Sequence, residues 1–125
     1  MARNIRLSAA LLLLGGALPA LAHHSFAIFD HTQTYTLKGT VQSFQWTNPH
    51  GYIELAVAEG PKGLEHFTIE LTSINMLRRA GWKSSDVHEG DEVTAIVAPL
   101  LNGDPGGLLL ELKVPDGLLA KLSLI

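Results

Sequence analysis

The sequence predicts a small, mainly β protein whose elements follow the order of an OB-fold, a five-stranded Greek-key barrel. Short segments of alternating apolar and polar residues recur through residues 35–122, which is typical of strands. One segment of helical spacing interrupts them between the third and fourth strands. A meandering β-sandwich is the main competing fold, but it gives no reason for a helix at that position. We therefore expect an OB-like barrel with one short helix.

In the first expected strand, residues 35–46, the alternation of apolar residues shifts by one position partway along. Leu37 and Val41 share one parity, whereas Phe44 and Trp46 share the other, and a glycine lies inside the run. Such a change requires an extra residue in the strand. The pattern therefore predicts a bulged and strongly bent first strand.

Strict alternation defines the next two strands, residues 52–58 and 64–71. Their expected inward residues are Ile53, Leu55, Val57, Phe67, Ile69 and Leu71. The outward positions of the second of these strands include Glu70. Further strands are expected at residues 92–98, 108–114 and 118–122. Ahead of the first strand, three apolar residues are expected to anchor the chain by packing, namely Phe26, Ile28 and Phe29.

Helical spacing occurs once in the expected domain, directly after Ser73, whose hydroxyl is a suitable N-cap. Ile74 and Leu77 supply its apolar side. Gly81 is expected to end the helix in a left-handed conformation, and Trp82 is expected to pack back against it.

The first 22 residues have the composition of a secretory signal. Two arginines precede an apolar run at residues 7–18, and Ala-Leu-Ala at 20–22 has the small-x-small form of a cleavage site. The run is shorter than the roughly 20 apolar residues of a spanning helix, so we expect cleavage after Ala22 and no membrane anchor. The remaining residues, 23–125, are expected to form a single barrel domain in the periplasm or outside the cell.

Composition excludes several classes of function. The absence of cysteine excludes disulfides, a thiol nucleophile and thiolate metal sites. With 9 basic against 12 acidic residues, the chain is not expected to bind nucleic acid. No serine elbow, His-Glu-x-x-His motif or glycine-rich phosphate loop is present. We therefore expect a binding protein rather than an enzyme.

Several motifs occur in a defined order along the mature chain. Residues 23–26 read His-His-Ser-Phe and residues 46–50 read Trp-Thr-Asn-Pro-His. The others are residues 37–41, 73–82 and 90–93. Together they resemble a family of small exported bacterial proteins of unknown function, in which the mature chain begins with His-His-Ser-Phe and carries a Trp-x-Asn-Pro-His turn. Ile74 departs from the family, which often has Pro at this first helical position. The resemblance implies an exported domain and supplies no activity.

The new N-terminus is the sharpest chemical feature of the sequence. Cleavage after Ala22 would let the α-amine and imidazole of His23 chelate one metal ion together. His24 or a third imidazole, for which His50 in the Pro49–Gly51 turn is the favoured candidate, would complete a nitrogen-rich set. Such a set suits Cu(II), which stands highest in the divalent affinity order. Zn(II) is a weaker expectation because it prefers a closed tetrahedron.

Two alternatives remain open. The terminal histidines can be simply solvated, as we expect for the isolated His31, His66 and His88. The barrel can also be a metal-independent module that binds a periplasmic protein partner or a small ligand through the loop between the first two strands. Four residues would form that site, namely Trp46, Asn48, Tyr52 and Arg79. Against this, Trp46 and Trp82 can be core residues, and Arg79 can offset the helix dipole.

Overall fold

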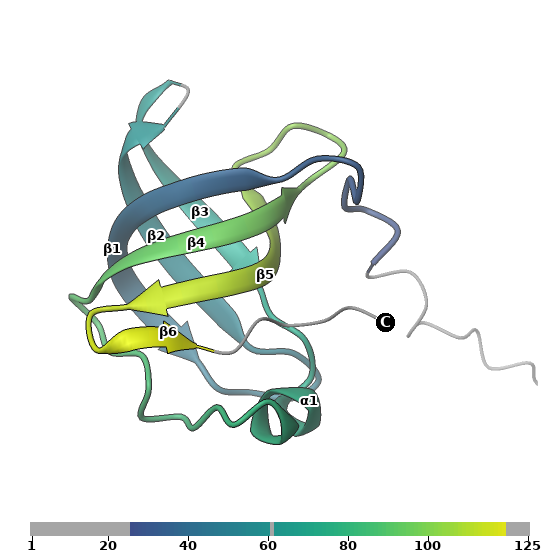
Figure 1. Cartoon of the computed structure of the whole chain (residues 1–125). Coiled ribbons are helices and arrows are strands. Elements are labelled where there is room, and N and C mark those ends of the chain that lie inside the picture. The colour runs from purple at the N-terminus through teal and green to yellow at the C-terminus, as the bar shows by residue number, and fades with distance from the viewer. Residues whose placement is uncertain (1–25, 61, 120–125) are drawn as a thin grey trace, which may run out of the picture.

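The computed structural model describes residues 26–60 and 62–119 of the 125-residue chain, and these residues form a β-barrel with one short helix (Figure 1). The elements in chain order are β1 (Tyr35–Gln45), β2 (Tyr52–Gly60), β3 (Gly63–Glu70), α1 (Ile74–Arg79), β4 (Glu92–Pro99), β5 (Gly106–Val114) and β6 (Gly117–Leu119). The helix therefore lies between the third and fourth strands, as the sequence predicts.

Five of the strands close into a barrel. The strand order is β3-β2-β1-β4-β5, and a parallel pairing between β3 and β5 joins the two edges. All other pairings are antiparallel, and β6 adds a short hairpin to β5. The predicted mainly β class and the barrel are confirmed. The last strand begins one residue earlier than expected, and residues 120–122 of its predicted range lie outside the described residues.

A bulge in β1 explains the change of parity in its sequence. Val41 pairs with Leu55 and Ser43 pairs with Glu54, so Gln42 is an extra residue in β1. The first half of the strand pairs with β4 and the second half with β2. At the bend, a Cβ on Gly39 would collide with the Ala56 carbonyl oxygen, which is why the position requires glycine. The predicted bulged and bent strand is confirmed.

The inward positions of the strands form the barrel core. Six residues are expected to point inward from β2, from β3 and from Leu71, which directly follows β3. All six are buried, at 0–5% exposure. Val93 of β4 and Leu109 of β5 complete the core from the opposite wall. The alternation in the sequence therefore locates the inside of the barrel correctly.

The helix α1 lies at one end of the barrel, close to the turn between β1 and β2 (Figure 1). The Ser73 hydroxyl accepts a hydrogen bond from the Met76 amide at 3.3 Å. At the other end, Gly81 has φ of +90°, and the Trp82 amide donates to the Leu77 carbonyl at 2.9 Å. This is a Schellman ending, and it buries Trp82 to 2% exposure. The interpretation of Trp82 as a core residue is confirmed.

A second apolar cluster lies apart from the main core. Phe29 packs with Ala98 and Leu108, and Phe26 is half-buried against the same cluster. The expectation that Ile28 is also an anchor is wrong, because it is 50% exposed. Ile28 lies in a turn whose Phe29 amide donates to the Phe26 carbonyl, whereas Phe29 forms an antiparallel bridge with Leu100 and packs on the second cluster.

None of the helices in the described ranges is long and apolar enough to cross a membrane.

Candidate functional site

His50 lies in the turn between β1 and β2, which is fastened to the end of β3. The Thr47 hydroxyl donates to the His50 carbonyl at 3.2 Å, and the Leu71 amide donates to the Gly51 carbonyl at 2.8 Å. The Asn48–Pro49 peptide bond in the same turn is cis. These contacts hold the backbone of His50 beside the last residue of β3, which is Glu70.

The His50 ring faces the carboxylate of Glu70. Nδ1 of His50 lies 3.9 Å from Oε1 of Glu70, and their side chains are 19% and 14% exposed. This separation is too long for a hydrogen bond but places the two groups in direct electrostatic contact. Nδ1 is buried and has no hydrogen-bond partner among the residues that the structure describes. The two groups form a partly buried histidine–carboxylate pair.

The ring of Phe26 makes a T-shaped contact with the ring of His50. Its ring centroid lies 6.1 Å from that of His50, at an interplanar angle of 89°. The segment that carries Phe26 is anchored by buried Phe29 and by a hydrogen bond from the Asp30 amide to the Pro99 carbonyl at 2.8 Å. The chain before β1 is therefore held against His50.

Tyr52 completes the surroundings of the carboxylate. It lies directly opposite Glu70 in the register of β2 and β3. Burial raises the pKa of the Glu70 carboxyl, and the His50 ring lowers it to a smaller extent. Burial and the Glu70 carboxylate together raise the pKa of the Tyr52 phenol. A negative charge on Glu70 is therefore unfavourable unless a cation lies beside it.

The raised pKa of Glu70 predicts a pH-dependent effect of Glu70→Gln on stability. Below about pH 4 the carboxyl is protonated in both the folded and the unfolded chain, so it adds no electrostatic penalty. As the pH rises through the ordinary pKa toward the raised one, the folded state retains the proton longer and the wild type loses stability relative to the variant. We expect the variant to melt at a higher temperature than wild type at pH 8, and this gap to close by pH 4.

Melting curves followed by circular dichroism at both pH values measure this gap. The exposed Glu59→Gln is the matched control for the change in net charge. A Glu70→Gln variant that melts below wild type at pH 8 would contradict the burial argument.

The other expected site residues differ in burial and in their contacts. His23 and His24 lie outside the described residues. Trp46 is half-buried against the main core. Its ring makes a T-shaped contact with the ring of Phe44, and the two ring centroids lie 5.9 Å apart. Asn48 is exposed in the turn.

Arg79 is exposed in the last turn of α1. Within residues 26–60 and 62–119, no hydrogen bond or ion pair joins it to Trp46, Asn48 or Tyr52. Of the expected ligand-binding residues, Tyr52 is therefore the one found with His50 around Glu70.

The other histidines that the structure describes are exposed. His31 bonds the Phe26 carbonyl at 2.9 Å, His66 bonds the side chain of Gln42, and His88 lies 3.6 Å from Asp91. In the part of the chain that the structure describes, no three His, Asp or Glu side chains converge to hold a metal ion.

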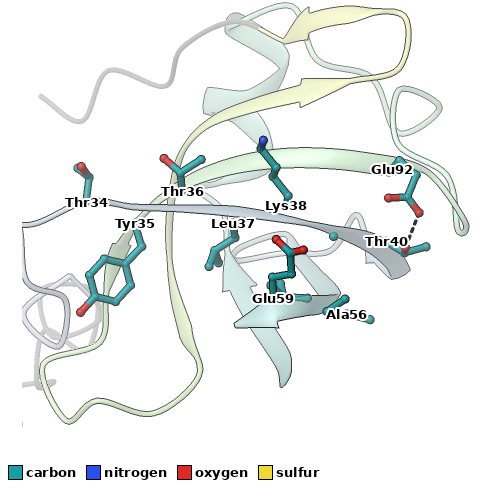
Figure 2. A pocket seen from close by; sticks show the side chains of 12 residues that line it. Thr34, Tyr35, Thr36, Leu37, Lys38, Thr40, Ala56, Glu59 and Glu92 are labelled. Atoms are coloured by element: carbon teal, nitrogen blue, oxygen red, sulfur yellow. Dashed lines mark hydrogen bonds between the residues drawn. The ribbon is translucent and has the colours of Figure 1, made fainter. Parts of the chain in front are cut away.

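A groove lies elsewhere on the barrel (Figure 2). It has a volume of about 890 Å³ and runs between the first half of β1 and the second half of β2, where the two strands no longer pair. Thr36, Lys38 and Glu59 are among its lining residues. His50 lies at the opposite ends of both strands. The groove and the histidine–carboxylate pair are therefore separate features.

Sequence reasoning missed Glu70. The alternation of β3 correctly places Glu70 on the outer side of the strand. Glu70 pairs there with Leu108 of β5, and Leu108 packs against Phe29, so this outer position is partly covered. The available signal was its register: the strand lengths and the short 59–63 turn predict that Glu70 pairs with Tyr52, two residues from His50. This pairing makes Glu70 a candidate partner of the histidine.

The fold and the site define a small closed β-barrel protein with a half-buried histidine–carboxylate pair at one end of the barrel. The chain belongs to a family of unknown function, DUF6152, whose model matches residues 10–110. No curated protein and no solved structure matches the chain.

Proposed function

We propose that this protein is an exported copper-binding protein rather than an enzyme. In this proposal the signal is removed after Ala22, and the processed chain acts in the periplasm. Its α-amine and the imidazole of His23 chelate Cu(II), and imidazoles from His50 and His24 complete the set of nitrogen ligands.

The contact between Phe26 and His50 carries the proposal. The two rings lie 6.1 Å apart, and Phe26 is only three residues after His23. Three residues of fully extended chain span at most about 11 Å. A link of this length would allow the amine and imidazole of His23 to reach the His50 ring. The anchoring of Phe29 and Asp30 supports the same conclusion, because it fixes where the preceding residues start.

The electrostatics of the site also favour a cation. Glu70 is partly buried, and burial disfavours its charged form. A bound metal ion would offset that cost by placing positive charge on the neighbouring imidazole. Nitrogen ligands in the absence of cysteine favour Cu(II) over a soft Cu(I) site.

His50→Ala tests the proposal in the processed protein that starts at His23. We expect the affinity for Cu(II), measured by competition with a chelator of known affinity, to fall by about 10–100-fold. His66→Ala is the matched control, because it removes an exposed imidazole from β3 and should leave the affinity unchanged. Equal affinities for the two variants would contradict the participation of His50.

A second candidate function is metal-independent binding of a partner or small ligand, and the groove between β1 and β2 favours it. Its volume of about 890 Å³ is in the range of small-molecule sites. A binding site in this groove would lie at the start of β1 and the end of β2. The loop that contains Trp46 lies at the opposite ends of these two strands. A copper affinity that neither His50 nor the free amine affects would make this candidate the better one.

A further inference from the structure

We infer that Glu70 is a positioning residue that holds His50 in one tautomer, with the proton on Nδ1 and a free lone pair on Nε2. This property belongs to the metal-free protein. Only its use, the presentation of Nε2 to a metal ion, rests on the proposed function.

The argument begins with the surroundings of Nδ1. A neutral imidazole carries its proton on one nitrogen, and the other nitrogen accepts. Nδ1 of His50 is buried, and the group that faces it is Oε1 of Glu70 at 3.9 Å. A carboxylate only accepts hydrogen bonds, so an unprotonated Nδ1 would place two lone pairs against each other. The geometry therefore favours the proton on Nδ1.

The backbone keeps this arrangement in place. The Leu71 amide donates to the Gly51 carbonyl at 2.8 Å, which joins the residues that follow Glu70 and His50. Because the two backbones are tied, side-chain rotations that shorten the contact by about 1 Å suffice to form an Nδ1–H···Oε1 hydrogen bond. The T-shaped contact with Phe26 also restricts the rotation of the ring.

This arrangement determines which atom of His50 can bind a metal. Nδ1 is occupied by its proton and is inaccessible, so Nε2 is the nitrogen that keeps a lone pair for a ligand. Carboxylates that accept from the second nitrogen of a metal-binding histidine orient the ring and raise its basicity. Glu70 would act in this way without touching the metal.

Long-range ¹H–¹⁵N NMR of the metal-free protein at about pH 8 tests the inference. We expect the wild-type His50 ring to carry its proton on Nδ1. In Glu70→Gln, the amide can donate as well as accept, so the preference should be lost and the Nε2–H form should appear. Glu54→Gln is the matched control, because Glu54 bonds the Thr68 hydroxyl at 2.9 Å on the neighbouring strand and does not face His50.

A wild-type His50 with its proton on Nε2, or a Glu70→Gln spectrum identical to wild type, would overturn the inference. Copper titrations distinguish the role of Glu70 from the proposed copper binding. If the tautomer inference and the copper-binding proposal are both correct, Glu70→Gln should weaken Cu(II) binding by about 10–100-fold and Glu54→Gln should not. If the tautomer behaves as expected but His50→Ala leaves copper binding unchanged, the role of Glu70 stands and His50 is not a copper ligand.

Discussion

Acetylation of the α-amine of His23 should weaken Cu(II) binding by the processed protein at least about 100-fold, which is about 2.7 kcal/mol. The amine and the imidazole of the same residue form one chelate ring, so blocking the amine removes a ligand and also breaks the ring. The fold should be unaffected, because acetylation changes no residue of the strands or of the helix. Competition with a chelator of known affinity measures the loss, and circular dichroism checks the fold.

A chain with one extra alanine before His23 is a less decisive comparison. The extension moves the free amine off His23, but it places His24 third in the sequence. A histidine at the third position can itself bind copper through deprotonated backbone amides. The acetylated chain blocks the amine in both arrangements, so it is the proper control. If acetylation and His50→Ala both leave the affinity unchanged, the N-terminal copper site is wrong and the terminal histidines are simply solvated.

Phe67→Ala should lower the free energy of unfolding by about 3–5 kcal/mol. Phe67 lies in the middle of β3 at 5% exposure and pairs across the sheet with buried Leu55. Truncation removes buried aromatic surface and leaves a cavity that a closed barrel cannot easily collapse, because the backbone hydrogen bonds of five strands hold its walls apart.

Urea denaturation followed by tryptophan fluorescence measures this change. His66→Ala, one position earlier on the exposed side of β3, should shift the free energy of unfolding by no more than about 0.5 kcal/mol. A Phe67→Ala protein as stable as wild type would mean that the side chain does not fill the barrel as described.

The strands and their inward faces could be predicted because local periodicity determines them. A residue such as Ile69 or Leu55 is buried because alternation places it on one side of a strand, and one side of each strand must face the core. The bulge in β1 was predictable for the same reason, since an extra residue reverses the alternation. The ends of α1 were predictable from Ser73 and Gly81, because caps act within a few residues.

The candidate site could be predicted only in part. His50 was identified from its residue type and its turn, but the sequence did not indicate what it faces. Glu70 is 20 residues away and alternates outward, which suggests an exposed carboxylate. Arg79, expected near the same loop, is exposed in the last turn of α1.

The sequence by itself determined the order of strands and helix, the residues that fill the barrel and the presence of a histidine in the first turn. These properties depend on interactions between residues that are close in the chain. The register of β2 and β3 indicates that Glu70 lies near His50, but only the tertiary structure decided that the carboxylate faces the ring and that Phe26 also contacts it. The packing of Phe29 holds the N-terminal segment in place for the second contact. Alternation along a strand shows which residues are buried, but not which side chains meet, because that depends on how separate segments pack.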